Sequence, residues 1–239
     1  MAFGANGILG VSVFNEDCGP GCVSSSSTGF YYSCTSTACA PTTVALAKQL
    51  PNPVRLFVTN NNGVIITLAS VPSQGAATLT GTMLFGIDTQ SNNKSGTQKI
   101  LTLNSQGDFT TDFNNQSLPS SFFDTGSSGL YFNDSNLTPC SATGGFKGFY
   151  CPTTTQNLSA TLQGTNAVSS TAAFSVANAE SASKANPTYA VFVNLAGTYP
   201  ASGGTGVFDW GLPFYFGKTV YTAFEGQTTS GGTGPYVAF

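Results

Sequence analysis

Short apolar stretches recur along the chain and are separated by residues that favour turns. From Asn52 onward these stretches are rich in Val, Ile, Phe and Thr, which is typical of strands of a mainly β fold with one or two short helices. A short helical turn is expected at residues 44–50, before Pro51. We expect strands at residues 54–59, 64–68, 75–87, 99–104, 108–113, 157–162, 171–177, 190–195 and 220–224.

Two turns between these strands have the composition of β-hairpins. Asn60-Asn61-Asn62-Gly63 separates the first two predicted strands, and Asn-Gly is the strongest short hairpin signal. Residues 105–107, which end in Gly107, separate the strands at 99–104 and 108–113. The sequence therefore predicts that each turn joins two paired strands.

Residues 120–133 carry the most informative pattern of the chain. Two Phe residues precede Asp124-Thr125-Gly126-Ser127, and Gly129-Leu130-Tyr131-Phe132 follows. This order predicts a buried strand that turns sharply, presents one carboxylate and re-enters the core. Glycine permits close backbone approach in such a turn, and the two hydroxyl groups can bond to the carboxylate.

Composition limits the classes of function that the chain can have. Only 7% of its 239 residues are charged, against roughly 25% in an average soluble protein, while 40% are hydrophobic. The net charge is -3 and basic residues form no cluster, so we expect no nucleic-acid partner. No apolar run reaches the roughly 18 residues of a membrane span.

The absence of histidine narrows the possible chemistry further. It excludes Ser-His-Asp and Cys-His catalysis and most zinc sites, and we expect no metal and no cofactor. A general acid or base must then be a carboxyl group, a tyrosine or a lysine. Asp124, in the Asp-Thr-Gly-Ser turn, is the candidate whose sequence context best suits a catalytic carboxyl group.

The six cysteines favour disulfides in an oxidising compartment over a thiolate zinc site, because the spacings do not fit a finger. We expect a bridge between Cys140 and Cys151. Cys18, Cys22, Cys34 and Cys39 can pair locally or in a nested way, and the spacing leaves both open. This composition indicates an exported protein, yet the first residues lack a signal peptide, so we expect an N-terminally incomplete chain.

Several stretches, taken in order, resemble the pepsin-like aspartic peptidases, in which each of two β-lobes has an Asp-Thr/Ser-Gly turn above a hydrophobic-hydrophobic-Gly strand. Residues 122–127 are similar to the turn of the second lobe, and residues 54–87 to the opening of that lobe. The residues that resemble the strands beneath the two turns are Ile8, Leu9, Gly10, Trp210 and Gly211. Nearly the whole chain also resembles a family of uncharacterised bacterial exported proteins, known as a domain of unknown function with a pepsin-like core.

The resemblance implies a role for each residue of the turn. Asp124 would be one of two catalytic carboxyl groups and Thr125 would bond across to the other lobe. Gly126 would donate its N–H to the carboxylate, and Ser127 would orient the outer oxygen. A second Asp-Thr/Ser-Gly is absent from the sequence. Asp209 adjoins a core strand but lacks a turn glycine, so we assign it no catalytic role.

We therefore expect residues 1–50 to be a remnant of the first lobe plus a cysteine-rich loop, and residues 51–239 to be the second lobe. Such a chain would be inactive alone, with a peptide substrate once the missing lobe is supplied. Two alternatives stay open: a non-catalytic binding or structural module of the cell envelope, and a dimer in which each copy supplies Asp124. For a binding module the candidate surface residues are Tyr31, Tyr32, Phe149 and Tyr150. Trp210, the single tryptophan, is expected in the core.

Overall fold

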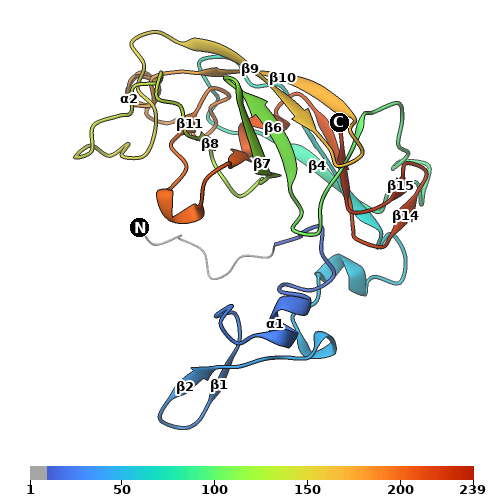
Figure 1. Ribbon diagram of the computed structural model, residues 1–239. Coiled ribbons are helices and arrows are strands. Elements are labelled where there is room, and N and C mark those ends of the chain that lie inside the picture. The colour runs from blue at the N-terminus through green and yellow to red at the C-terminus, as the bar shows by residue number, and fades with distance from the viewer. Residues whose placement is uncertain (1–9) are drawn as a thin grey trace.

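The computed structural model describes residues 10–239, and over that range the protein is mainly β with short helices (Figure 1). The larger sheet has seven strands in the order β10 (Ser169–Val176), β9 (Gln156–Gln163), β6 (Phe109–Phe113), β7 (Gln116–Phe123), β12 (Phe208–Trp210), β8 (Leu130–Phe132) and β11 (Ala196–Gly197). The smaller sheet has five, in the order β4 (Gly81–Phe85), β3 (Gly63–Leu68), β13 (Thr219–Ala223), β16 (Tyr236–Ala238) and β5 (Ile100–Thr102).

Shorter elements lie between these strands. They are the ladders of β1 (Tyr32–Cys34) with β2 (Cys39–Pro41) and of β14 (Thr228–Thr229) with β15 (Gly232–Thr233), the helices α1 (Pro20–Ser24) and α2 (Ala179–Ala185), and the 3₁₀ turns η1 (Leu46–Lys48), η2 (Pro53–Leu56), η3 (Ala201–Gly203) and η4 (Leu212–Tyr215). Within residues 10–239, none of the helices has the length and apolar character needed to cross a membrane.

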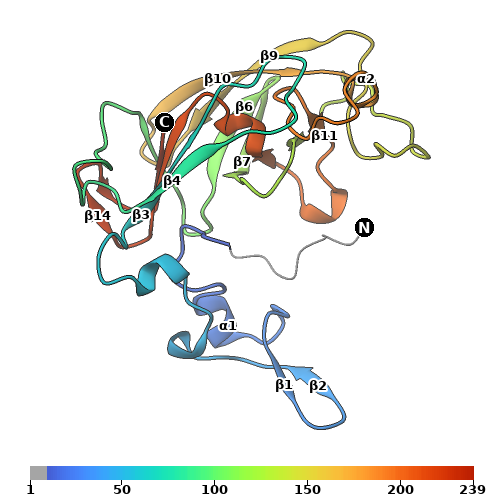
Figure 2. The ribbon, with the colours of Figure 1, turned by 180° about the vertical axis from the view of Figure 1, so that it is seen from behind.

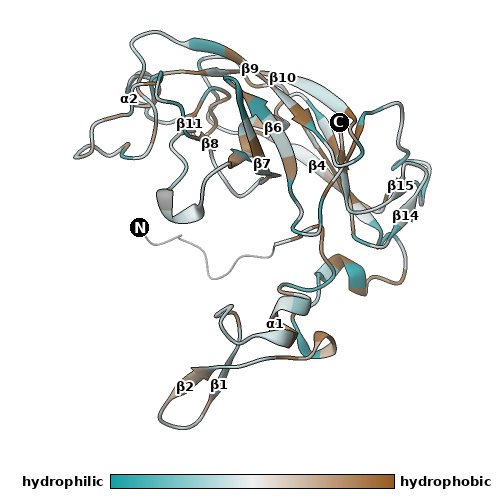
Figure 3. Cartoon of the chain, viewed as in Figure 1, coloured by the Kyte–Doolittle hydropathy of each residue, from teal (hydrophilic) through white to brown (hydrophobic). Residues whose placement is uncertain are grey.

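The two sheets curve into a nearly closed, barrel-like body around a main hydrophobic core, with two smaller clusters of buried apolar residues in addition. Along β6 the first, third and fifth residues are buried and the other two are not, as expected for a strand packed on one face. Apolar and polar segments are accordingly interleaved on the strands in Figure 3. Leu101 of β5, Val220 of β13 and Val237 of β16 join the same core from the smaller sheet.

A stack of aromatic rings occupies part of this core. Phe208 lies between Phe132 and Trp210, with ring centroids 4.5 and 4.1 Å from its own. Phe174 meets Trp210 edge to face at 5.6 Å. The Trp210 indole N–H donates a 3.0 Å hydrogen bond to the Thr111 hydroxyl, so the polar atom of the ring is satisfied. Trp210 is 1% exposed, which confirms its expected place in the core.

The strand predicted at residues 54–59 is wrong. This segment begins with η2, because Pro53 suits the first position of a helical turn and the Asn52 side chain accepts a 3.1 Å hydrogen bond from the Val54 N–H. The hairpin through Asn60–Gly63 is therefore wrong as well. The strand that follows, β3, pairs with β4 and β13 instead.

The second predicted hairpin is also wrong, although its turn forms. Asn104 and Asp108 bond through their backbones, with the Asn104 N–H donating to the Asp108 carbonyl at 2.9 Å. The strands on either side lie in different sheets, β5 beside β16 and β6 beside β7. β6 instead forms a hairpin with the strand that follows it, β7, through Asn114 and Asn115, whose φ angles of 49° and 60° suit a tight two-residue turn.

The other predicted elements divide as follows. Strands at 64–68, 157–162, 171–177 and 220–224 are confirmed with small shifts, and the helical turn at 44–50 is confirmed as η1. The strand predicted at 75–87 is shorter, since only β4 forms there. The strand at 190–195 is wrong: apart from a bridge between Val191 and Ala76 the segment is irregular, and β11 begins after it.

Residues 16–51 form a cysteine-rich arm that projects from the sheets, and Figure 2 shows the same projection from behind. An antiparallel bridge between Glu16 and Pro51 closes the base of the arm. The disulfides Cys18–Cys22 and Cys34–Cys39 lie within it, so these four cysteines pair locally and not in the nested way. The predicted bridge between Cys140 and Cys151, in the main body, is confirmed.

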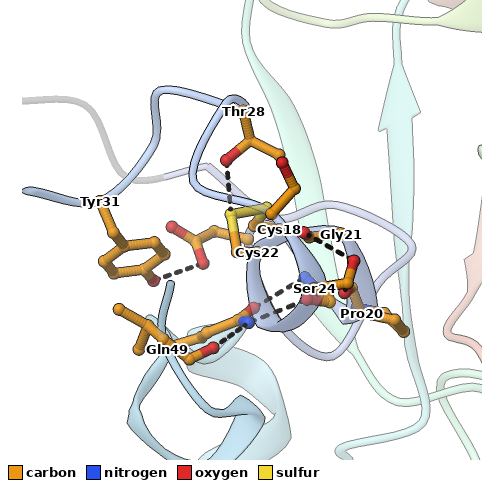
Figure 4. The surroundings of a disulfide bond; sticks show 12 residues. Cys18, Pro20, Gly21, Cys22, Ser24, Thr28, Tyr31 and Gln49 are labelled. Carbon is orange, nitrogen blue, oxygen red and sulfur yellow. Dashed lines mark hydrogen bonds between the residues drawn. A yellow bond between two sulfur atoms is a disulfide. The ribbon is translucent and has the colours of Figure 1, made fainter. Parts of the chain in front are cut away.

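A buried glutamine organises the arm around its first disulfide (Figure 4). The Gln49 amide accepts from the Gly19 N–H at 2.7 Å and donates to the carbonyls of Gly19 and Val44 at 2.8 and 3.1 Å. The Tyr31 hydroxyl donates to Asp17 at 2.6 Å on the neighbouring loop. The arm is thus held by covalent closure and by amide hydrogen bonds.

Asp88 links two loops at one end of the smaller sheet. Its carboxylate accepts hydrogen bonds from the backbone N–H groups of Ser95 and Ser230, at 2.7 and 3.1 Å, and from both hydroxyl groups. Burial disfavours the charged form, but the hydrogen bonds from Ser230 and Ser95 outweigh it and lower the pKa of Asp88 to about 2.

We expect Asp88→Asn to lower the free energy of unfolding near pH 7 by about 1–2 kcal/mol, because the neutral amide accepts these bonds less strongly and solvent screens part of the effect. The lowered pKa means that the wild type loses this contribution as the pH falls from about 4 to about 2. Urea denaturation at several pH values measures both effects. Asp112→Asn, at an exposed carboxyl group of β6, is the control, and equal losses in the two variants would contradict the role of Asp88.

Candidate functional site

The predicted Asp-Thr-Gly-Ser turn lies between β7 and β8, which are not paired with each other. β12 runs between them, parallel to β7 and antiparallel to β8. Asp209 of β12 is opposite Phe122 on one side and Tyr131 on the other. A strand from late in the chain therefore separates the two strands that flank the turn.

Gly211, which follows β12, allows this strand to pass directly under the turn. A Cβ atom at Gly211 would collide with the carbonyl oxygen of Gly129 and would lie 2.8 Å from that of Ser127. Two backbone bonds close the contact: the Leu212 N–H donates to the Ser127 carbonyl at 2.8 Å, and the Asp124 N–H donates to the Trp210 carbonyl at 3.1 Å. The turn is thus fixed to β12 at both of its ends.

The carboxylate of Asp124 is held by its own turn. The Gly126 N–H donates to Oδ1 at 2.7 Å, and the Ser127 hydroxyl oxygen lies 2.7 Å from Oδ2. Asp124 is half-buried, whereas the Thr125 side chain is exposed and makes no hydrogen bond to another residue of the described chain. Asp124 is therefore both oriented and accessible.

A second carboxyl group lies against the same hydroxyl. Asp209 Oδ2 is 2.9 Å from the Ser127 Oγ, so the two carboxyl groups are separated by one hydroxyl oxygen. Asp209 is 5% exposed, and its Oδ1 is buried without a hydrogen-bond partner among the described residues. Burial raises the pKa of Asp209 to about 7 and outweighs the opposing effect of the hydrogen bond from Ser127, and the Asp124 charge adds a smaller contribution in the same direction as burial.

The alternation of β12 explains why Asp209 faces the turn. Phe208 and Trp210, on either side of it, point into the aromatic stack, so the side chain between them points to the opposite face. Tyr131 of β8 and Tyr215 of η4 are near the carboxyl groups. Burial raises the pKa of both tyrosines, and the charge of Asp209 adds to this at Tyr131, as do the charges of Asp124 and Asp209 at Tyr215. They are neutral hydroxyl groups around the acidic pair.

The residues predicted for the site are brought together in part. Asp124, Gly126, Ser127 and Gly211 meet as described, and Trp210 supports them from the core. Ile8 and Leu9 lie outside the described residues, and Gly10 is exposed in an irregular segment.

Asp209 was not assigned a role from the sequence. The available signal was a charged residue between Phe208 and Trp210 in the densest aromatic stretch, where an apolar residue is expected.

Two other features lie outside the Asp-Thr-Gly-Ser turn. A cavity of about 370 Å³ is lined by Trp210, Phe214 and Lys218, among others, and by none of the residues of the turn. Burial lowers the pKa of Lys218, whose Nζ donates to the Phe214 carbonyl at 2.6 Å.

Glu180 lies near Cys140 and Cys151, but a disulfide occupies both sulfur atoms, so this group cannot act as a thiolate metal site.

Comparison with known proteins gives a family without an assigned activity. The family model described as "Protein of unknown function (DUF3443)" matches residues 1–239. A search of curated proteins found no match.

We expect Gly211→Ala to lower the free energy of unfolding by about 3 kcal/mol, because the added methyl group meets rigid backbone rather than a flexible side chain. Gly145→Ala is the matched control, since the position has open space around it, and it should change stability by less than about 0.5 kcal/mol. Guanidinium denaturation measures both. Similar values would mean that β12 does not need to approach the turn so closely.

We expect Asp209 to give the protein an unusual dependence of stability on pH. Because its folded-state pKa is raised to about 7, its contribution is present below about pH 4 and is lost as the pH rises to about 7. Asp209→Asn should remove this loss, so that the variant gains at least about 1.4 kcal/mol relative to the wild type between pH 5 and pH 8. Thermal or urea unfolding across this range is the measurement, and parallel curves for both proteins would contradict it.

Proposed function

The chain belongs to this family of unknown function, and we propose that it forms one lobe of an exported pepsin-like aspartic peptidase-like protein, with Asp124 as one of two reacting carboxyl groups. The observation that carries the proposal is the placement of the Asp-Thr-Gly-Ser turn over β12, which runs between β7 and β8 and approaches the turn through Gly211. This is the arrangement that the resemblance to pepsin-like lobes implies.

The contacts of Asp124 suit that chemistry. Two carboxyl groups that share a proton allow one to stay protonated while the other activates water for attack on an amide. Hydrogen bonds from the Gly126 N–H and the Ser127 hydroxyl hold the Asp124 carboxyl group in one orientation, as a reacting carboxyl group requires. Thr125 is exposed beside it, available for a contact outside this chain.

The partner carboxyl group should come from outside these residues. Asp209 is near enough to influence Asp124, but Ser127 lies between them and Asp209 is almost completely buried, so it cannot reach a substrate. We therefore expect the isolated chain not to hydrolyse peptides. The three disulfides support an exported location, because such bonds persist in oxidising compartments.

A binding module is the second candidate, and exposed apolar side chains on the arm favour it. Tyr32, on β1 of the projecting hairpin, is 54% exposed, and Phe30, two residues before it in the chain, is 62% exposed. The other aromatic candidates pack within the protein: Tyr31 bonds to Asp17, Phe149 contacts Tyr131, and the Tyr150 hydroxyl donates to the Phe132 carbonyl.

The test is peptide cleavage by the protein expressed from its complete natural reading frame, followed by mass spectrometry of an unfolded substrate between about pH 3 and pH 7. We expect cleavage at acid pH that Asp124→Asn reduces roughly a thousandfold or more, while Asp112→Asn, at an exposed carboxyl group, leaves it unchanged.

Two results would count against the proposal. No cleavage by the complete protein would favour the binding module. Cleavage by residues 1–239 alone would show that a second lobe is not needed, and a rate per molecule that rises with protein concentration would then indicate a dimer that pairs two copies of Asp124.

A further inference from the structure

The hydroxyl group of Ser127 lies within hydrogen-bond distance of two carboxyl groups. Its oxygen lies 2.7 Å from Asp124 Oδ2 and 2.9 Å from Asp209 Oδ2. A serine hydroxyl has a single proton to donate. If both carboxyl groups were ionised, one of these short oxygen–oxygen contacts would have no hydrogen in it, and two negative charges would face each other across one atom.

The surroundings decide which carboxyl group keeps a proton. Asp124 is half-buried and also accepts a bond from the Gly126 N–H, whereas Asp209 is 5% exposed and has a buried oxygen without a partner. The titratable groups that face Asp209 are Asp124 after β7, Tyr131 on β8 and Tyr215 on η4. None of them is a cation, so nothing among them compensates a charge on Asp209.

We propose that Asp209 is a positioning residue for Asp124: its carboxyl group retains a proton and donates it to the Ser127 oxygen, which directs the Ser127 hydroxyl hydrogen to Asp124. The hydrogen bonds then run in one direction, from Asp209 Oδ2 to Ser127 Oγ and from Ser127 Oγ to Asp124 Oδ2. Each of the two short contacts contains one hydrogen.

Loss of the Asp209 proton reverses this order. The buried carboxylate then competes for the Ser127 hydrogen, and Asp124 keeps only the bond from the Gly126 N–H. The raised pKa of Asp209, about 7, puts the change between acid and neutral pH. Asp124 is thus held by both hydrogen bonds at acid pH and loses the one from Ser127 above neutral pH. The role as a positioning residue rests on the proposed function of Asp124, whereas the proton itself can be followed without any activity.

The experiment is a pH titration, from about pH 3 to pH 9, of the chain labelled with ¹³C at the aspartate carboxyl carbons, observed by NMR. Asp209→Asn and Asp124→Asn assign the two signals. We expect the Asp209 signal to titrate near pH 7, and the Asp124 signal to show a second, smaller inflection at the same pH as its hydrogen bond from Ser127 is lost.

Two substitutions at Ser127 separate this role from general structural support. Ser127→Ala should reduce the second inflection of Asp124 to the small part that the Asp209 charge produces through space, while Asp209 still titrates above its ordinary range. Ser127→Thr, which keeps a hydroxyl group, should restore the inflection. Amide spectra of each variant check folding, and the wild type with either Ser127 variant decides the result even if Asp209→Asn does not fold.

Two outcomes would overturn the proposal. One is an Asp209 signal that titrates below about pH 5, which would mean that Asp209 is charged at neutral pH. The other is a second Asp124 inflection that keeps its full size in Ser127→Ala, which would mean that Ser127 does not connect the two groups. Either outcome leaves the peptidase proposal standing, because Asp124 could still react without this connection. Conversely, an inactive complete protein with the expected titrations would reject the peptidase and retain the proton arrangement.

Discussion

The passage of β12 between β7 and β8 is the constraint on which the rest of this molecule depends. It requires a glycine at position 211, because the strand passes within contact distance of the Gly129 carbonyl. It also sets the two faces of β12: Phe208 and Trp210 enter the core stack, and Asp209 faces the turn. One close backbone approach thus places an aromatic core and an acidic pair on opposite sides of the same three residues.

The burial of Asp209 is costly, and its position gives that burial a use. A carboxyl group with an unsatisfied oxygen is unfavourable in an apolar environment, and an apolar residue at this position would pack against the same neighbours without that cost. Departures from good packing of this kind are expected where a site needs them. The connection to Asp124 through Ser127 is the only use of that carboxyl group visible among the described residues.

The low charge content shapes the rest of the fold. Besides the Asp88 carboxylate, buried amides connect several segments in the described part of the chain: Asn52 bonds to the backbone of Ser12 and Phe14 at the base of the arm, Gln49 bonds within it, and Asn62 joins the start of β3 to Ile87. These side chains donate and accept at once, so they satisfy backbone groups without bringing a charge out of water. Local disulfides add covalent closure in the arm, which has little core of its own.

The sequence by itself determined the features that depend on near neighbours. Short apolar stretches between turn residues were enough for the β class and for strands such as β9 and β10, and local sequence context was enough for the Cys140–Cys151 bridge and the turn at Asp124. Tertiary structure alone decided which strands pair. The turn after β5 forms as its sequence predicts, but the strands before and after it, β5 and β6, belong to different sheets. It alone also placed Asp209 beside Ser127, 82 residues away. Alternation fixes the face on which a side chain lies, but only long-range packing brings another group to that face.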